Sequence, residues 1–436
     1  MNSMNFRNKY KRLVFFMKHS SLHKGWLMLF LIVLSVLACL GFGRFSFGAI
    51  LPFMKDGLLL DYRQTGLIAS SIFLGYLVAV LLSGFFVLRF SAKKVIVASL
   101  LVISLGMIIT ANAPNFFVAY MGSFITGLGS GGSYVPSLGL ISQWFSPKKR
   151  GMAMGTAMAG SGVGMVFSGF AVPAIVVINI DQGWRISWYI LAFLVIAIAL
   201  INWLFLKDKP EDAGLLPIGA TNNNPTSINT LEEPLVKPKT VYSNKTLWFI
   251  GSIYFLWGMS YLIFSTFLVD YLITDVHFTS QQAGNFFAAA GVASIISGFV
   301  WGSVSDKLGR MVSLMIVFFT QFFMLMGLSF TTDSLLIFMQ VIIYGSTLWG
   351  VPTIMNASVG DYIDAKYIPV AMGFVTIFFS AGQLVSPIIT GFLIDYTNSY
   401  LSAHLMSAIT CFICGLGCYS LFHFERKKAS SFKLEV

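Results

Sequence analysis

Long apolar stretches alternate with short polar segments along almost the whole chain. A helix rises about 1.5 Å per residue, so roughly 20 apolar residues cross the hydrocarbon core of a bilayer. Stretches of that length predict twelve membrane-spanning helices, at residues 25–50, 66–88, 95–113, 116–142, 151–178, 184–206, 247–272, 281–304, 311–331, 334–360, 370–394 and 400–424. The pattern therefore predicts an all-α polytopic membrane protein made of two six-helix bundles.

Polar segments divide the chain into five parts. We expect a basic tail, a first bundle, a linker rich in Pro, Asn and Thr, a second bundle and a short tail, at 1–24, 25–206, 207–245, 246–425 and 426–436. A basic leader before an apolar run can be a signal peptide. The run at 25–50 is longer than the usual signal core of about 7–15 residues, so we predict a retained first helix.

Composition supports lipid as the main solvent. Hydrophobic residues make up 56% of the chain and charged residues 10%, against about 25% charged in a soluble domain. Cys411, Cys414 and Cys418 have the spacing C-x2-C-x3-C, but no His or carboxylate lies near them in the sequence. We therefore interpret them as apolar helix residues and predict no metal site, no cofactor and no nucleic-acid partner.

Basic residues predict the orientation. If the amino terminus is inside, 24 of the 28 Lys and Arg residues fall in inner segments. Because inner loops are enriched in Lys and Arg, both termini and the linker should be cytoplasmic, in an inner-membrane protein. Lys55, Arg63 and Arg185 are then assigned to outer loops, and Arg44 lies within the first span.

The two halves repeat each other. Five glycine pairs are each separated by 218 residues, in three different helices: Gly84 and Gly302, Gly127 and Gly345, Gly132 and Gly350, Gly155 and Gly373, and Gly164 and Gly382. Repeats of this kind occur in alternating-access transporters, where one site lies between two bundles that rock against each other.

Residues 302–310 carry the most specific motif, G-x-x-x-D-K-x-G-R. Here the chain resembles the major facilitator superfamily, in which this pattern joins the second and third helix of each half. The resemblance implies a conformational gate formed by Gly302, Asp306, Gly309, Arg310 and Arg150.

In that gate, Asp306 should lie beside the start of the fifth helix, close to Lys148, Lys149 and Arg150. The first-half copy has Leu88 where the acid is expected. Arg89, Lys93 and Lys94 should then face Asp361 and Asp364 of the other half.

A closer resemblance covers about a third of the chain. The joint between spans four and five, the run GWRISWYILAF from Gly183 and the run LKDKPEDAGLLPIG from Leu206 are similar to monocarboxylate transporters and the oxalate/formate antiporters. Span 281–304 has none of the charged residues that those carriers use there. Spans one and seven look more like a poorly characterised bacterial branch of the superfamily.

Arg44 is the strongest candidate for a binding residue. An arginine inside the membrane is costly and must face a wet cavity or a partner. Its R-x7-P spacing to Pro52 is similar to that of an anion-binding arginine in organic-phosphate antiporters, but Leu262 stands where their second arginine would repeat. One guanidinium suits a carboxylate. The alternative is a structural arginine bound by carbonyl groups or by Asp270.

Other polar and aromatic side chains lie in the spans that, by resemblance, line a central cavity or its neighbours. The candidate substrate contacts are Trp257, Tyr261, Tyr344, Trp349, Asn356 and Gln383. Each of them is also a typical packing or interface residue. The run GLGSGGS at 127–133 lacks the G-K-[ST] of a phosphate loop and is interpreted as a site of close helix packing.

We expect a secondary active transporter of a small organic anion that works as a monomer by alternating access. The alternative is efflux of amphipathic drugs, or transport of a siderophore. An enzyme is not expected, because no acid–base or metal cluster lies at bilayer depth. Either a proton or a counter-anion could drive transport. Asp270, at the outer end of span seven, is the coupling candidate, although we expect it to be well solvated.

Overall fold

The computed structural model describes residues 23–219, 239–364 and 367–434. Most of the predicted basic tail, the middle of the linker and Lys366 lie outside the described residues.

The first half contains six long helical segments. The first of them is continuous from Lys24 to Leu58 and includes nine π-helical residues. The helices are α2 (Lys24–Val36), η1 (Leu37–Phe45), α3 (Ser46–Leu58), α4 (Tyr62–Phe90), α5 (Ala92–Ala111), α6 (Phe116–Trp144), α7 (Pro147–Ile178) and α8 (Gly183–Phe205). The first span is therefore longer than predicted at its carboxyl end, since Pro52 does not end it.

The second half repeats this arrangement after a short 3-10 turn, η2 (Glu211–Ala213), and α9 (Lys239–Tyr242). Its helices are α10 (Lys245–Thr274), α11 (Ser280–Leu308), α12 (Arg310–Phe330), α13 (Ser334–Thr347), α14 (Gly350–Val359), α15 (Ile368–Thr397) and α16 (Leu401–Leu434). The predicted tenth span is broken at Leu348 and Trp349, between α13 and α14. Helix α16 continues beyond the predicted start of the carboxyl-terminal tail.

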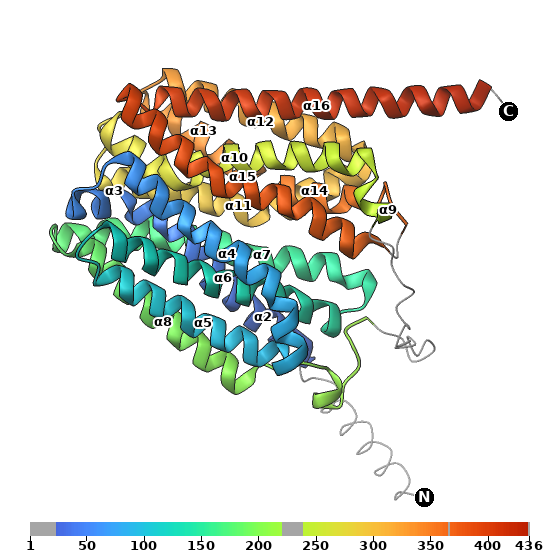
Figure 1. The fold of residues 1–436 in the computed structure, drawn as a ribbon, viewed down its shortest axis with the longest axis horizontal. Helices are drawn as coiled ribbons and strands as arrows, with labels where there is room; N and C mark the ends of the chain where they lie inside the picture. The colour runs from blue at the N-terminus through green and yellow to red at the C-terminus, as the bar shows by residue number, and fades with distance from the viewer. Residues whose placement is uncertain (1–22, 220–238, 365–366, 435–436) are drawn as a thin grey trace, which may run out of the picture.

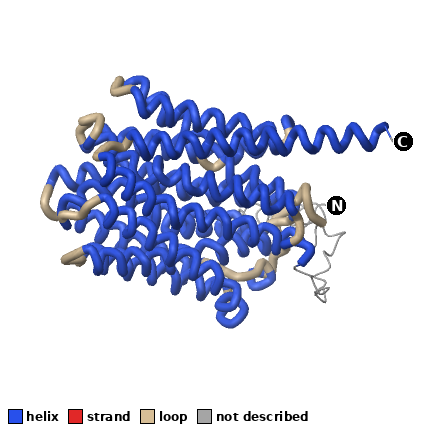
Figure 2. The backbone as a smooth tube through the Cα atoms, turned by 45° about the horizontal axis from the view of Figure 1, so that its top comes forward, coloured by secondary structure: helices blue, strands red, loops and turns tan. Residues whose placement is uncertain are grey.

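The two halves form two layers of antiparallel helices (Figure 1), and tan loops join the helices at both ends (Figure 2). One end carries η2, α9 and the last turns of α16, and we call it the linker end (Figure 1). The opposite end is the far end. The predicted all-α fold of two six-helix bundles is confirmed.

Eleven of the described helical segments are long and apolar enough to cross a membrane. The twelfth segment is α6, which carries the glycine- and serine-rich run 127–133 in its middle. This run is helical, as predicted, and its glycines meet backbone atoms of the neighbouring helices. A Cβ on Gly127 would meet the backbone of Ile72, and one on Gly129 would lie 2.6 Å from the backbone nitrogen of Ile103. Small residues thus allow α6 to pack closely against α4 and α5.

The halves touch closely toward the far end. A Cβ added to Gly162 of α7 would lie 2.9 Å from the carbonyl oxygen of Gly291 in α11. Gly66 of α4 meets the backbone of Pro387 in α15 in the same way, and Gly391 meets that of Tyr62. Backbone-to-backbone contact of this kind leaves no room for any side chain.

The same helices separate toward the linker end. At Gly84 of α4, Gly155 of α7 and Gly373 of α15, no atom of another described element lies within 4 Å of the place where a Cβ would lie. Leu81 and Phe85 of α4 are exposed there. The structure is therefore closed at the far end and open at the linker end.

Two glycines of α4 provide a matched test of this closure. Gly84→Ala should raise the free energy of unfolding by up to about 1 kcal/mol, because alanine favours a helix and meets nothing there. Gly66→Ala should lower it by about 1–3 kcal/mol, because the methyl group would overlap the Pro387 backbone. Thermal unfolding of the purified protein in detergent measures both. Shifts of the same sign would contradict the close contact.

Candidate functional site

Arg44 lies in a π-helical segment at the centre of the first span. Segment η1 replaces the ordinary α-helical turn over nine residues, and Arg44 is its last residue but one. Short π-helical insertions are rare and concentrate at functional sites. Gly41, in the same segment, packs against the backbone of Gly164 in α7, and Ser46 donates to the Gly41 carbonyl at 3.2 Å. The glycine at position 41 therefore lets this segment pack directly against α7.

The guanidinium of Arg44 has aromatic neighbours but unused donors. Its carbon lies 4.5 Å from the ring centre of Phe73 and 4.6 Å from that of Tyr76, both on α4. The side chain is also within electrostatic and hydrogen-bonding reach of the hydroxyls of Tyr76 and of Tyr261 in the second half. Its Nε and Nη2 atoms are buried and have no hydrogen-bond partner among the described residues. The structural alternative, an arginine bound by carbonyl groups or Asp270, does not satisfy these two atoms.

The second half presents a stack of aromatic rings toward this region. Tyr254, Trp257, Tyr261 and Phe379 stack with ring centres 4.4–5.8 Å apart. The Trp257 indole donates to Gln321 at 3.1 Å. Its N–H group is therefore already hydrogen-bonded within the second half. Gln383 donates to the hydroxyl of Tyr261, which leaves the buried Gln383 Oε1 without a partner.

Of the remaining predicted contacts, Trp349 and Tyr344 are buried and Asn356 is exposed. Trp349 packs against Phe45, beside Arg44 in sequence, with ring centres 5.4 Å apart, and its indole nitrogen is buried without a partner. Tyr344 stacks on Phe264 at 4.1 Å and also has an unpartnered hydroxyl. Asn356 is exposed on α14 and does not join this buried group.

Asp270 occupies a buried ion pair rather than a solvated loop. Its carboxylate lies 3.1 Å from the ammonium of Lys55, and the side chains are 0% and 10% exposed. Tyr400, the residue directly before α16, donates to the same carboxylate. Lys55 donates to the hydroxyl of Tyr62 at 2.8 Å and lies over its ring at 4.1 Å. The cluster joins α3 and α4 of the first half to α10 and the turn before α16 in the second.

Two predictions are therefore wrong. Lys55 does not lie in an outer loop, because α3 continues for a full turn beyond Pro52 and carries it into the protein. Asp270 is not well solvated, and its partner is Lys55 instead of Arg44. The physical reason is shared: each charge can be buried because the other half supplies its counterion.

The residues of the gate motif do not make the contacts expected from the sequence. Asp306 pairs with Arg310 at 2.6 Å on its own loop and is 66% exposed. Arg310 also lies 3.8 Å from Asp361. Arg150 donates to the carbonyl groups of Ser142 and Phe145 at the end of α6. The expected ion pairs of Asp306 with the start of α7, and of Arg89, Lys93 and Lys94 with Asp361 and Asp364, do not occur within the described residues.

The open linker end explains that difference. Asp306 lies at the end of α11, where the halves are apart, so the amino end of α7 is out of its reach. Gly302 retains a packing role, since a Cβ there would lie 3.3 Å from Thr353 of α14. Gly309 has a φ of 90°, a conformation that glycine adopts without strain.

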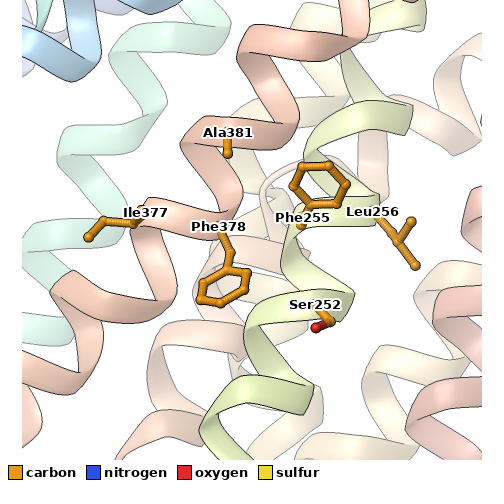
Figure 3. Close-up of a pocket in the computed structure, with 6 residues that line it drawn as sticks. All are labelled: Ser252, Phe255, Leu256, Ile377, Phe378 and Ala381. Carbon is orange, nitrogen blue, oxygen red and sulfur yellow. The ribbon is translucent and has the colours of Figure 1, made fainter. Parts of the chain in front are cut away.

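An apolar cavity of about 530 Å³ lies between α10 and α15 (Figure 3). Its lining is apolar except for the hydroxyl of Ser252, and it includes Phe255, Leu256, Ile377, Phe378 and Ala381. No charged side chain lines this cavity, so it offers no counterion for an anion.

The sequence analysis did not identify the residues that contact Arg44 and Asp270. Phe73 and Tyr76 flank Arg44, while Lys55, Tyr62 and Tyr400 complete the site of Asp270. The spacing of Lys55 one turn beyond Pro52 was the available signal, because α-helices in membranes tolerate proline.

Comparison with known proteins finds one matching family model and several relatives. A sequence model of the Major Facilitator Superfamily matches residues 33–368. A hexuronate transporter of Bacillus subtilis is 24% identical over 87% of this chain and 90% of its own length. A probable sulfoacetate transporter of Cupriavidus necator is 23% identical over 82% and 84%, and monocarboxylate transporter 12 of Xenopus laevis is 23% identical over 82% and 80%.

Solved structures share the fold. A bacterial homolog of the human lysosomal transporter Spinster, in an inward-facing and unoccupied conformation, has a TM-score of 0.72 at 15% identity, covering 92% of this chain and 97% of that one. The nucleoside transporter NupG has a TM-score of 0.69 at 14% identity, covering 91% and 98%.

The Lys55–Asp270 pair can be tested by removing one charge or both. Asp270→Asn leaves a buried ammonium without a counterion, which costs about 3–5 kcal/mol in the far-end-closed state. Loss of the far-end-closed state favours the state in which the linker ends meet and cover position 155 of α7. Gly155→Cys should therefore react with a membrane-impermeant thiol reagent at least about tenfold more slowly in the Asp270→Asn protein than in the parent. The native Cys39, Cys411, Cys414 and Cys418 are buried and give little background.

The double variant Lys55→Met/Asp270→Leu is the matched control. It replaces the pair with apolar side chains, so labelling should return toward the parent rate. Equal labelling of the single variant and the parent would contradict a role of the pair in closure.

Proposed function

The chain belongs to the Major Facilitator Superfamily, and on that premise we propose that it transports a small organic anion of the carboxylate class across the inner membrane. The observation that carries this proposal is the buried Arg44 with two unpartnered N–H donors. A buried charge without a counterion is strongly disfavoured. Its contacts with Phe73 and Tyr76 offset about 0.5–2 kcal/mol each at most. An incoming carboxylate supplies what is missing.

The geometry suits one carboxylate group. Arginine presents a planar set of donors that binds both oxygens of a carboxylate at once. Across the interface, Gln383 Oε1 is a free acceptor, and the Trp349 indole is a free donor. These groups suit the hydroxyl or second polar group of a sugar acid. Relatives named as transporters of hexuronate, L-galactonate, sulfoacetate and cis,cis-muconate point to the same class of substrate.

We further propose that transport proceeds by alternating access around Arg44. The halves touch at the far end and are apart at the linker end. If the Lys and Arg distribution sets the orientation, the linker end is cytoplasmic and this state faces inward. In the opposite state, the linker ends would close. Asp306 would then reach the amino end of α7 and Arg150, while the Lys55–Asp270 pair would separate into water.

We propose exchange of anions as the driving mechanism. Asp270 has to be ionised to pair with Lys55 whenever the far end closes. A proton that Asp270 takes up while the far end is open must therefore leave before the far end closes. It returns to the side from which it came and is not carried across the membrane. An empty Arg44 would remain a buried charge while the halves rock, which slows the return step. A counter-anion on Arg44 removes that cost.

Substitution of Arg44 tests the binding proposal in uptake assays with proteoliposomes. Arg44→Ala should abolish uptake of hexuronate, galactonate and sulfoacetate. Arg44→Lys keeps the charge and loses the planar set of donors, so it should weaken apparent affinity by about tenfold or more. Arg185→Lys is the control, because Arg185 donates to the backbone carbonyls of Ala111 and Ala113 and lies over the ring of Trp184. Normal anion uptake in Arg44→Ala, or uptake of cationic dyes alone, would favour drug efflux and refute the proposal.

The coupling proposal has its own outcome. Liposomes preloaded with a substrate anion should take up labelled anion, and empty liposomes should not, even with an imposed pH gradient. Uptake driven by the pH gradient alone, and lost in Asp270→Asn, would make Asp270 a proton carrier and overturn exchange.

A further inference from the structure

The two halves differ where their second and third helices join. Ser91 and Gly309 occupy equivalent positions, 218 residues apart, and share one backbone conformation, with φ and ψ of 83° and 153° against 90° and 153°. The side chains around them are not equivalent. Leu88 stands at the position of Asp306, and Ala92 at that of Arg310. The first-half loop has therefore lost both members of the ion pair that the second half forms.

That loop keeps its basic residues without acidic partners. Arg89, Lys93 and Lys94 form no ion pair within the described ranges. Arg89 lies over the ring of Phe90 at 5.5 Å, and Lys93 over that of Trp203 at 5.6 Å. The acid bound to this loop is Asp208, which accepts from the backbone amide of Lys93 at 2.7 Å. Three cations thus share one end of the first half.

An apolar cavity of about 500 Å³ begins at Lys94, one of these cations. It lies between α4, α5 and α6, with Lys94 at its linker end and Val102 among its deepest residues on α5. These two positions are eight residues apart, so the cavity extends roughly 12 Å along the helix. Leu82, Phe86 and Phe90 line it from α4, and all three are exposed.

The second half fills the equivalent space with its own side chain. Trp301 packs against Gly350, with its Cγ 2.7 Å from where a Cβ would lie, and its indole donates to the carbonyl of Ser346 at 2.9 Å. The equivalent residues in the first half are Ser83, Gly132 and Leu128, and all three line the cavity. The cavity exists because serine stands where the repeat has tryptophan.

We propose that this cavity binds an anionic phospholipid. One acyl chain occupies the space that Trp301 fills in the other half, and the phosphate lies among Arg89, Lys93 and Lys94, where the loop lacks its acid. Basic pockets between helices at the cytoplasmic surface suit anionic headgroups, each cation contributing through its charge. A free phosphate would leave the apolar cavity empty, and a neutral lipid would leave the cations unpaired.

Lipid titration of the purified protein in neutral detergent tests the proposal, with native mass spectrometry and thermal unfolding as readouts. Phosphatidylglycerol should bind and raise the unfolding temperature. Phosphatidylcholine with the same chains and glycerol phosphate without chains should do neither. Lys94→Gln should weaken binding of phosphatidylglycerol about fivefold. Ser83→Trp, which copies the second half, should abolish it.

Two further variants make the outcome decisive. Lys307→Gln removes an exposed cation from the equivalent second-half loop, which lacks the cavity, and should leave phosphatidylglycerol binding unchanged. Ala98→Phe fills the same cavity from α5 and replaces Ser83→Trp if that variant does not fold. Equal binding of phosphatidylcholine, equal effects of Lys94→Gln and Lys307→Gln, or full binding in a folded filled-cavity variant would each overturn the proposal.

Discussion

Close contact between the two halves at one end is the interaction on which the rest of the structure depends. In a membrane, apolar helices gain little by leaving lipid for one another, so association relies on tight packing and polar contacts. Gly66 and Gly391 provide such packing at the far end, Gly162 provides it at the middle of α7, and Lys55 and Asp270 add a buried ion pair at the far end. These contacts are short-ranged. They can therefore hold one state without preventing the other.

Most of the fold could be predicted from local features of the sequence. The length and polarity of each apolar stretch depend only on the thickness of the membrane, and the glycine repeat relates the halves without any structure. Arg44 could be singled out for the same reason, because a cation at that depth needs an explanation wherever the other helices lie. The interpretation of 127–133 as a packing run also required only the absence of phosphate-loop residues.

The pairings between the halves could not be predicted in this way. Lys55 and Asp270 are 215 residues apart, and each looked like the solvated end of its own helix. Only the register of α3 against α10 brings them together. The position of Asp306 depends on a further variable, which is the conformational state. Its expected contact with the start of α7 requires the linker ends to be closed. They are open in this structure.

The contrast between the two buried cations explains why an anion is the expected substrate. Lys55 has its counterion within the chain, and that counterion belongs to the other half, so the pair is complete only while the far ends touch. Arg44 has two unused donors at the centre, and Asp270 is already committed to Lys55. In the proposed mechanism, its counterion is the transported anion. A bound carboxylate would neutralise Arg44 in either state, which lets the halves rock without carrying an unpaired charge through the membrane.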